Sequence, residues 1–139
     1  MDKNYINTDD TGIHLIMDIT IKDIFNPNIS SEDTCREYIN ECVKISDMEK
    51  IEDVRVHSLP YDDNMCGITA LIPLSTSHIS LHTWVEFNYI SIDLYSCKYF
   101  DVNEIIEYTK KYFDASEMRI VKIERFINKP QNIIQWKEA

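Results

Sequence analysis

Apolar residues recur along the chain with two spacings, one typical of β-strands and one typical of α-helices. Short apolar runs and alternating polar and apolar positions predict strands, which fall at about residues 13–19, 52–59, 67–75, 78–87, 89–97 and 118–127. Apolar residues three or four positions apart predict amphipathic helices, which fall at about residues 32–46 and 102–113. Ser30 and Ser31 precede the first helix and Asp101 the second; Ser and Asp are good helix caps.

The order of these elements defines the expected fold class. One strand and one helix are followed by four strands, a second helix and a last strand. The breaks between residues 67 and 97 are too short to hold helices, and strands joined by short turns pair antiparallel. We therefore expect an α+β fold, a two-layer α/β sandwich with a mostly antiparallel sheet and two helices on one face. The 139 residues suit a single domain, 1–139, with a peripheral tail from Asn128.

The composition narrows the kinds of partner. Fourteen Lys and Arg stand against 24 Asp and Glu, a formal net charge of -10. Such a charge repels nucleic acid and anionic membranes and attracts a small cationic molecule. No apolar run reaches the length of a membrane span, and the start, MDKNYINTDDTG, lacks the order of a signal peptide. The four cysteines form no CxxC pair, so reduced thiols and a cytoplasmic location are expected.

The predicted strand at 78–87 separates its side chains into an apolar and a polar face. Because side chains alternate along a strand, one face carries His78, Ser80, His82, Trp84 and Glu86. Two histidines four residues apart on a helix can share one zinc ion. On a strand their Cα atoms lie roughly 13 Å apart, so no metal site is predicted.

The same segment carries a resemblance to a known family. The string TSHISLHTWVE occupies residues 76–86, Gly67-Ile68-Thr69 precedes it, and IDLYSC follows at 92–97. Gly12-Ile13-His14-Leu15 extends the similarity to the start of the chain. Together these segments resemble the short, bacterial-type S-adenosylmethionine decarboxylases, and the combination is more specific than any single triad-like pattern.

The resemblance implies a proenzyme that cuts its own chain and makes its own cofactor. In this family the serine at the position of Ser77 attacks the carbonyl of the preceding residue, here Thr76, and converts the amide into an ester. Elimination then divides the chain into a β segment, 1–76, and an α segment, 77–139, which begins with a pyruvoyl group. This ketone forms a Schiff base with the substrate amine and draws electrons as carbon dioxide leaves.

The resemblance also implies roles for further residues. His82 matches the histidine that removes a proton during processing, Thr69 matches a hydroxyl residue that supports ester formation, and Cys97 matches the catalytic acid. Imidazoles accept protons near neutral pH and thiols can return a proton to carbon, so these residue types suit the chemistry. For Glu86 three interpretations stay open: a solvated carboxylate, a substrate contact or a structural contact. A homodimer of processed protomers, with active sites near the subunit interface, is also implied.

Several positions depart from the family pattern. Thr76 stands where a glutamate usually precedes the processing serine, and Val85 replaces a proline. Leu59 occupies the place of an aromatic residue that would stack on adenine, although Tyr61 can substitute for it. None of these changes removes a reacting group, but the change at Leu59 bears on the identity of the substrate.

Three functions follow as alternatives. The first is decarboxylation of S-adenosylmethionine, which gives the aminopropyl donor for spermidine synthesis. The second keeps the pyruvoyl group and takes arginine or ornithine, because Asp62 and Asp63 can pair with a guanidinium or ammonium group. The third is an unprocessed homologue that regulates a catalytic partner, since Thr76 replaces the usual glutamate at the cleavage position.

Overall fold

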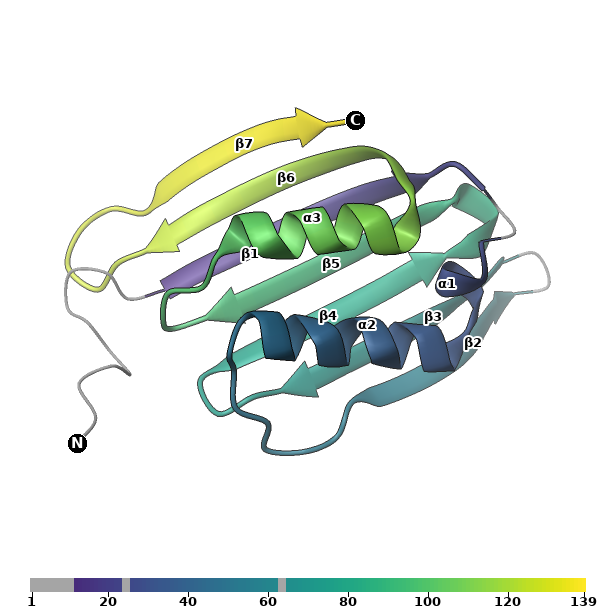
Figure 1. The fold of residues 1–139 in the computed structure, drawn as a ribbon, viewed down its shortest axis with the longest axis horizontal. Helices are drawn as coiled ribbons and strands as arrows, with labels where there is room; N and C mark the ends of the chain where they lie inside the picture. The colour runs from purple at the N-terminus through teal and green to yellow at the C-terminus, as the bar shows by residue number, and fades with distance from the viewer. Residues whose placement is uncertain (1–11, 24–25, 63–64) are drawn as a thin grey trace.

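The chain forms a single antiparallel sheet with its helices on one side (Figure 1). The computed structural model describes residues 12–23, 26–62 and 65–139. Within them, seven strands lie in the spatial order β2-β3-β4-β5-β1-β6-β7. The strands are β1 (Gly12–Ile21), β2 (Arg55–Asp62), β3 (Met65–Pro73), β4 (Ser77–Trp84), β5 (Tyr89–Ser96), β6 (Ala115–Arg125) and β7 (Asn132–Glu138). The helical elements are α1 (Pro27–Ser30), α2 (Glu32–Ile45), the 3-10 turn η1 (Val85–Phe87) and α3 (Val102–Phe113). The expected α+β sandwich is confirmed.

The sheet has one buried face and one open face. Helices α2 and α3 lie on the same side of the sheet, where Figure 1 shows them in front of the strands. Side chains that point toward them are fully buried, among them Leu15, Leu81 and Leu94 at 0% exposure. The alternating side chains point to the other side, which no element of the described chain covers, and we call it the open face.

The two long helices contact each other as well as the sheet. Tyr38 of α2 is fully buried, and its hydroxyl lies 2.6 Å from Oγ1 of Thr109 in α3. Its ring stacks on Tyr108, with centroids 5.6 Å apart and planes 9° apart. An apolar body with a satisfied polar tip allows a tyrosine to sit in a core. The Tyr38 contacts therefore join α2 and α3 into one layer.

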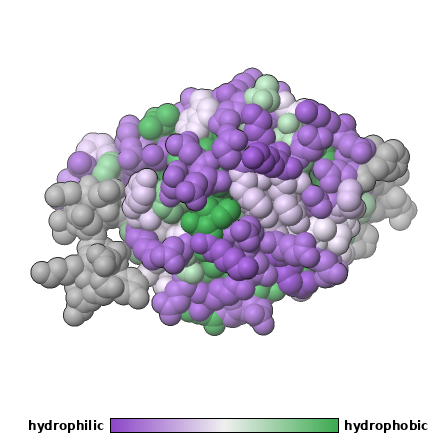
Figure 2. Space-filling view, viewed as in Figure 1, coloured by the Kyte–Doolittle hydropathy of each residue, from purple (hydrophilic) through white to green (hydrophobic). Residues whose placement is uncertain are grey.

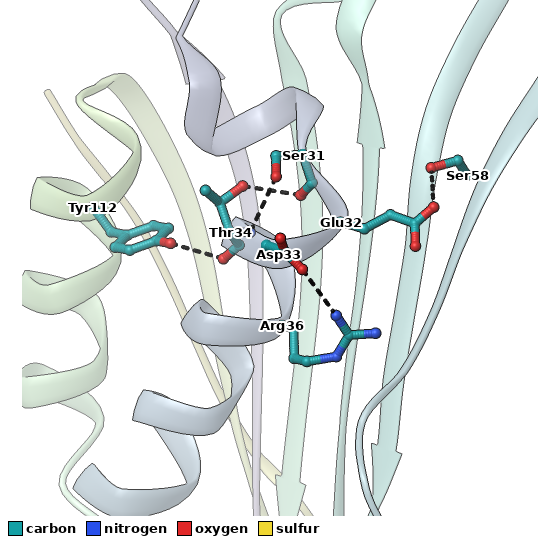
Figure 3. Close-up of polar contacts among 7 residues, drawn as sticks. All are labelled: Ser31, Glu32, Asp33, Thr34, Arg36, Ser58 and Tyr112. Atoms are coloured by element: carbon teal, nitrogen blue, oxygen red, sulfur yellow. Dashed lines mark hydrogen bonds and ion pairs between the residues drawn. The ribbon is translucent and has the colours of Figure 1, made fainter.

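The first turn of α2 is held from three directions (Figure 3). The Ser31 hydroxyl caps the helix by accepting the N–H of Thr34 at 3.4 Å. From α3, the Tyr112 hydroxyl donates to the Thr34 carbonyl at 2.7 Å. From β2, the Ser58 hydroxyl donates to the Glu32 carboxylate at 2.6 Å. The predicted cap is confirmed, and the turn connects the helix layer to the edge of the sheet.

Several strand boundaries differ from the sequence prediction by up to three residues. The strand expected at 52–59 begins at Arg55 and continues through Pro60, which is tolerated because β2 lies at the edge of the sheet. The strand expected at 78–87 ends at Trp84, because Val85–Phe87 turns and Asn88 adopts a left-handed conformation with φ 52°. Phe87, expected on the apolar face, is consequently 61% exposed.

The C-terminal segment is not peripheral, which is a further correction. Residues Asn132–Glu138 form β7, which pairs along β6 from Met118↔Glu138 to Glu124↔Asn132. Trp136 of this strand packs against the hydrophobic core. The pairing was missed because an edge strand of this kind depends on a partner strand, not on a local pattern.

Polar side chains cover most of the helix side of the molecule, with small apolar areas between them (Figure 2). None of the helices in the described ranges is long and apolar enough to cross a membrane.

Candidate active site

A tight turn joins β3 to β4 and contains the Thr76–Ser77 peptide bond. Leu74 and Ser77 flank a two-residue loop, Ser75 and Thr76, and the Leu74 N–H donates to the Ser77 carbonyl at 2.8 Å. The Ser75 N–H donates to the carbonyl of Glu49 at 3.0 Å. Backbone bonds on both sides therefore hold this peptide bond in place.

The end of β5 contacts both chemical groups that an acyl shift at this bond would use. The Cys97 N–H donates to the Thr76 carbonyl oxygen at 3.3 Å. On the neighbouring residue, the Ser77 hydroxyl donates to Oγ of Ser96 at 3.0 Å. A backbone N–H aimed at a carbonyl oxygen stabilises negative charge that develops there during nucleophilic attack. The turn thus presents a polarised carbonyl beside a buried hydroxyl.

Thr69 and His82 form a second group on the open face. They are directly opposite in the β3–β4 register, and Oγ1 of Thr69 lies 3.0 Å from Nδ1 of His82. Both side chains are half-buried. A hydrogen bond at one ring nitrogen orients an imidazole and leaves the other nitrogen for proton transfer. The sequence named both residues, and the structure brings them together.

Ser77 and His82 do not meet within one chain. β4 runs without interruption from Ser77 to Trp84, so five strand steps separate the two Cα atoms by roughly 16 Å. Ser77 is 9% exposed and faces the helices, whereas His82 faces the open side. His82 could reach that hydroxyl within one chain only if the chain turned between the two residues, and β4 makes no such turn.

Aromatic rings extend the second group along the open face. Trp84 lies between His82 and Tyr89, with ring centroids 5.9 Å and 5.5 Å away. The Tyr89 hydroxyl donates to the Asp18 carboxylate. Burial, followed by this bond and the Asp18 charge, raises the pKa of Tyr89 to about 12. The sequence prediction missed Tyr89 and Asp18, although strand alternation places both residues on the open face.

A separate polar pair occupies the open face near the start of β1. Nε2 of His14 lies 3.0 Å from the Asp93 carboxylate. The Tyr95 ring contacts His14 edge-on and His78 at a tilt, with centroids 6.4 Å and 5.7 Å away. The Arg125 guanidinium lies 4.8 Å from the centre of the same ring. The open face is therefore rich in polar and aromatic groups along its length.

Glu86 lies beyond the far end of β4 and contacts Cys66 of β3. Its carboxylate accepts the Cys66 N–H at 2.6 Å. Hydrogen bonding with the Cys66 thiol is the main cause that lowers the pKa of Glu86, and the same bond raises the pKa of Cys66. A cavity of about 330 Å³ adjoins this pair and is lined by Ser30, Ser58, Leu59, Cys66, Gly67, Ile68 and Val85.

The residues named from the sequence thus form three groups along β4. Ser77, Thr76 and Cys97 lie at its start, Thr69 and His82 in its middle, and Glu86 beyond its end. The side chains of Tyr61 and Asp62, and all of Asp63, lie outside the described residues. The suggestions that Tyr61 replaces an adenine-stacking residue and that Asp62 and Asp63 bind a basic substrate stay predictions.

Comparison with known proteins gives the family of the chain and agrees with its fold. The sequence pattern of the S-adenosylmethionine decarboxylase family matches residues 13–126. An S-adenosylmethionine decarboxylase proenzyme of a Hydrogenobaculum species is 34% identical over 87 residues, which are 62% of this chain and 59% of that protein. One from Archaeoglobus fulgidus is 28% identical over 69 residues, 50% of this chain and 57% of that protein.

The fold itself is found in a solved relative. The crystal structure of the adenosylmethionine decarboxylase from Aquifex aeolicus VF5 superposes with a TM-score of 0.71 at 23% sequence identity. The match covers 89% of this chain and 98% of that one. The antiparallel α+β sandwich and the family match together define the class of protein. The chain belongs to the S-adenosylmethionine decarboxylase family. It spans less than two thirds of the length of the curated relatives described above.

Proposed function

We propose that this protein is a self-processing, pyruvoyl-dependent S-adenosylmethionine decarboxylase that cleaves itself between Thr76 and Ser77. One observation carries the proposal. In a member of this family, the carbonyl to be attacked accepts the Cys97 N–H at 3.3 Å while the Ser77 hydroxyl lies buried beside it. The products are the segments 1–76 and 77–139. The decarboxylated product would serve as the aminopropyl donor for spermidine synthesis.

The chemistry of Ser77 fits the precursor of a pyruvoyl group. Its hydroxyl can attack the adjacent carbonyl, and its own atoms supply the ketone that remains after elimination. Once formed, this group supplies an electrophilic carbonyl that binds the substrate amine and accepts electrons during loss of carbon dioxide. The formal net charge of -10 favours a cationic substrate such as S-adenosylmethionine.

Cys97 is proposed as the proton donor of the decarboxylation. It is half-buried and directly follows β5, and its own N–H contacts the Thr76 carbonyl. A thiol next to the new chain end can return a proton to the substrate carbon. A reducing compartment such as the cytoplasm keeps this thiol available, and we place the protein there.

His82 is proposed to act on the Ser77 of a second copy. Within one chain roughly 16 Å of strand separates them, whereas both His82 and its partner Thr69 project from the uncovered sheet face. A homodimer that joins two open faces buries the half-exposed rings of Trp84 and Tyr89. Because the Ser77 hydroxyl points to the helix side, the atom that such a dimer would bring near the Thr69–His82 pair of the other subunit is Ser77 Cα, whose proton is removed during elimination.

Glu86 and the adjoining cavity are proposed to contact the substrate away from the reacting carbon. Glu86 is an exposed carboxylate whose pKa is lowered, so it carries a negative charge that suits hydroxyl donors or a cation. Leu59 lines the cavity next to Cys66. An apolar wall with one charged rim residue is typical of small-molecule sites. Tyr61, whose side chain lies outside the described residues, is proposed to contact the substrate.

The test is an intact-mass measurement of the purified protein combined with a decarboxylation assay. We expect two fragments, 1–76 and 77–139, the second beginning with a pyruvoyl group, and release of labelled carbon dioxide from carboxyl-labelled S-adenosylmethionine. Ser77→Ala should remain whole and inactive, because alanine has no hydroxyl. Ser75→Ala is the matched control, since it removes an exposed hydroxyl from the same turn.

Two results would redirect the assignment. If the protein decarboxylates arginine or ornithine in preference to S-adenosylmethionine, its substrate is a basic amino acid and only the proposed pyruvoyl group is kept. A wild-type chain that stays whole after long incubation, with no turnover, would exclude the enzymatic proposal and leave the regulatory one.

A further inference from the structure

Ser96 lies directly opposite Ser77 where β4 and β5 pair. Opposite residues in an antiparallel pair project to the same face, with Cβ atoms about 5 Å apart. Both side chains point toward the helices, Ser96 at 0% exposure and Ser77 at 9%. The register of the sheet thus places a second hydroxyl within reach of Ser77.

Two donors converge on Oγ of Ser96. The Ser77 hydroxyl donates to it at 3.0 Å, and the N–H of Lys98 donates to it at 3.1 Å. The backbone bond from Lys98 fixes the position of the acceptor oxygen. Because Ser77 directs its hydrogen toward Ser96, the lone pairs on the Ser77 oxygen stay available for attack.

Consecutive residues of one segment therefore contact both groups of the cleavage reaction. Ser96 accepts the hydrogen of the nucleophile, and Cys97 donates its N–H to the oxygen of the carbonyl under attack. Other candidates are less well placed. The Thr76 hydroxyl lies 3.4 Å from Ser77 Oγ, and His82 lies on the opposite face of the strand.

We propose that Ser96 is the positioning residue for the nucleophile in self-cleavage, an inference that rests on the proposed function. Its hydroxyl holds Ser77 Oγ in the orientation from which that oxygen bonds to the Thr76 carbonyl carbon. The C–N bond of the peptide then breaks, and the proton lost by Ser77 Oγ is gained by Ser77 N. The step is an isomerisation from amide to ester and requires no other reactant.

The test follows the rate of cleavage in freshly purified or refolded proenzyme by mass spectrometry. Ser96→Ala should slow cleavage by about 10-fold or more, the effect of losing one well-placed hydrogen bond in the transition state. Ser96→Thr keeps the oxygen and should cleave within about 3-fold of wild type. Ser96→Cys keeps a side chain of similar size but is a weak acceptor, so it should also be slow.

A control variant distinguishes a role of Ser96 in positioning Ser77 from a role in the stability of the fold. Thr83 is also fully buried, and its hydroxyl accepts the Ile68 N–H at 2.9 Å, away from the cleavage turn. Thr83→Ala should lower the melting temperature about as much as Ser96→Ala and leave the cleavage rate unchanged. The contrast holds even where both variants lose part of the folded population, because the rate is measured per folded molecule.

Hydroxylamine identifies the step that is affected, since it cleaves esters but not amides. If ester formation itself is slowed, no ester accumulates. Adding hydroxylamine to Ser96→Ala should therefore produce no additional fragments. With the role proposed for His82, His82→Ala should form the ester without eliminating it, so this variant should gain fragments quickly. Equal cleavage rates for wild type and Ser96→Ala would overturn the inference while leaving the proposed function intact. A wild-type chain that never cleaves overturns both.

Discussion

Thr69 and His82 face each other across β3 and β4, with 3.0 Å between the Thr69 hydroxyl oxygen and Nδ1 of the histidine. This pair is held on the open face, whereas the cleavage turn directs Ser77 to the helix side. The separation has a direct consequence for the proposed processing. If His82 removes a proton during elimination, the proton comes from the Ser77 of another subunit.

Mixed subunits test this arrangement. Ser77→Ala and His82→Ala chains should each stay whole when expressed alone. Co-expressed with different tags, they should form heterodimers in which the His82→Ala chain is cleaved, because its intact Ser77 receives His82 from the other subunit. Mass spectrometry of each tagged chain measures the outcome. Purified heterodimers with both chains whole would show that the histidine does not act across the interface.

Thr69 should influence processing through the orientation of the His82 ring. Thr69→Val keeps the shape and removes the hydroxyl, so elimination should slow by about 10-fold, with ester accumulating. The role that the family resemblance implies for Thr69, support of ester formation, would instead leave no ester. Thr69→Ser restores the oxygen and should restore most of the rate. The ester is measured as the fraction of chain that hydroxylamine cleaves. If Thr69→Val and Thr69→Ser behave alike, the hydroxyl has no part in orienting the ring.

Cys97 should separate cleavage from decarboxylation. Its backbone N–H contacts the Thr76 carbonyl, and Cys97→Ser keeps that N–H. We therefore expect the variant to cleave but to lose decarboxylation by about 100-fold, the usual effect of removing a general acid. Fragment mass and carbon dioxide release from the same sample give both quantities. Full decarboxylation by Cys97→Ser would assign the proton donor elsewhere.

Cys66 should react with alkylating agents at a higher pH than an ordinary exposed thiol. The bond to the Glu86 carboxylate stabilises the protonated thiol, which raises the pKa of Cys66. Thiolate is the reactive form. Glu86→Gln removes the charged acceptor, so the pH at which Cys66 alkylation is half-maximal should fall. Peptide mass spectrometry resolves Cys66 from the other cysteines, and an unchanged midpoint in Glu86→Gln would contradict the contact.

Tyr38 should contribute to stability through its buried hydroxyl and make stability sensitive to alkaline pH. Tyr38→Phe should cost about 1 kcal/mol, because the Thr109 hydroxyl keeps its own bond to the Ile105 carbonyl at 2.6 Å. Burial raises the pKa of Tyr38 well above its usual value. Above about pH 10 the unfolded chain therefore loses a phenolic proton that the folded chain keeps, and stability falls as pH rises.

Urea unfolding at pH 8 and at pH 10.5 measures both effects. Tyr38→Phe should lose less stability than wild type between the two values, since it has no phenolic group at this position. Tyr99→Phe is the matched control, because the Tyr99 side chain is 71% exposed in the folded chain. An identical decrease in wild type and Tyr38→Phe would show that other groups govern alkaline unfolding.

Local pattern was sufficient for the two long helices, for six of the seven strands in the described residues, and for the family. Alternation over residues 78–84 predicted which side chains face the core, because a strand exposes one face to the helices and one away from them. Caps at Ser31 and Asp101 predicted where α2 and α3 begin. The residues of the cleavage turn, and the hydroxyl and histidine of the open face, were named from short strings of sequence.

Only the tertiary structure decided which residues meet. Ser96 contacts Ser77 because β5 pairs with β4 in one particular register, and that register depends on the turn and on the partner strand as well as on the pattern of either strand. The same applies to β7, which exists as a strand because β6 offers it an edge. His82 and Ser77 are close in sequence yet lie on opposite faces, since a strand places odd and even residues on different sides. The sequence was enough to name the residues proposed to react, whereas the pairing of the strands determined which side chains lie next to them.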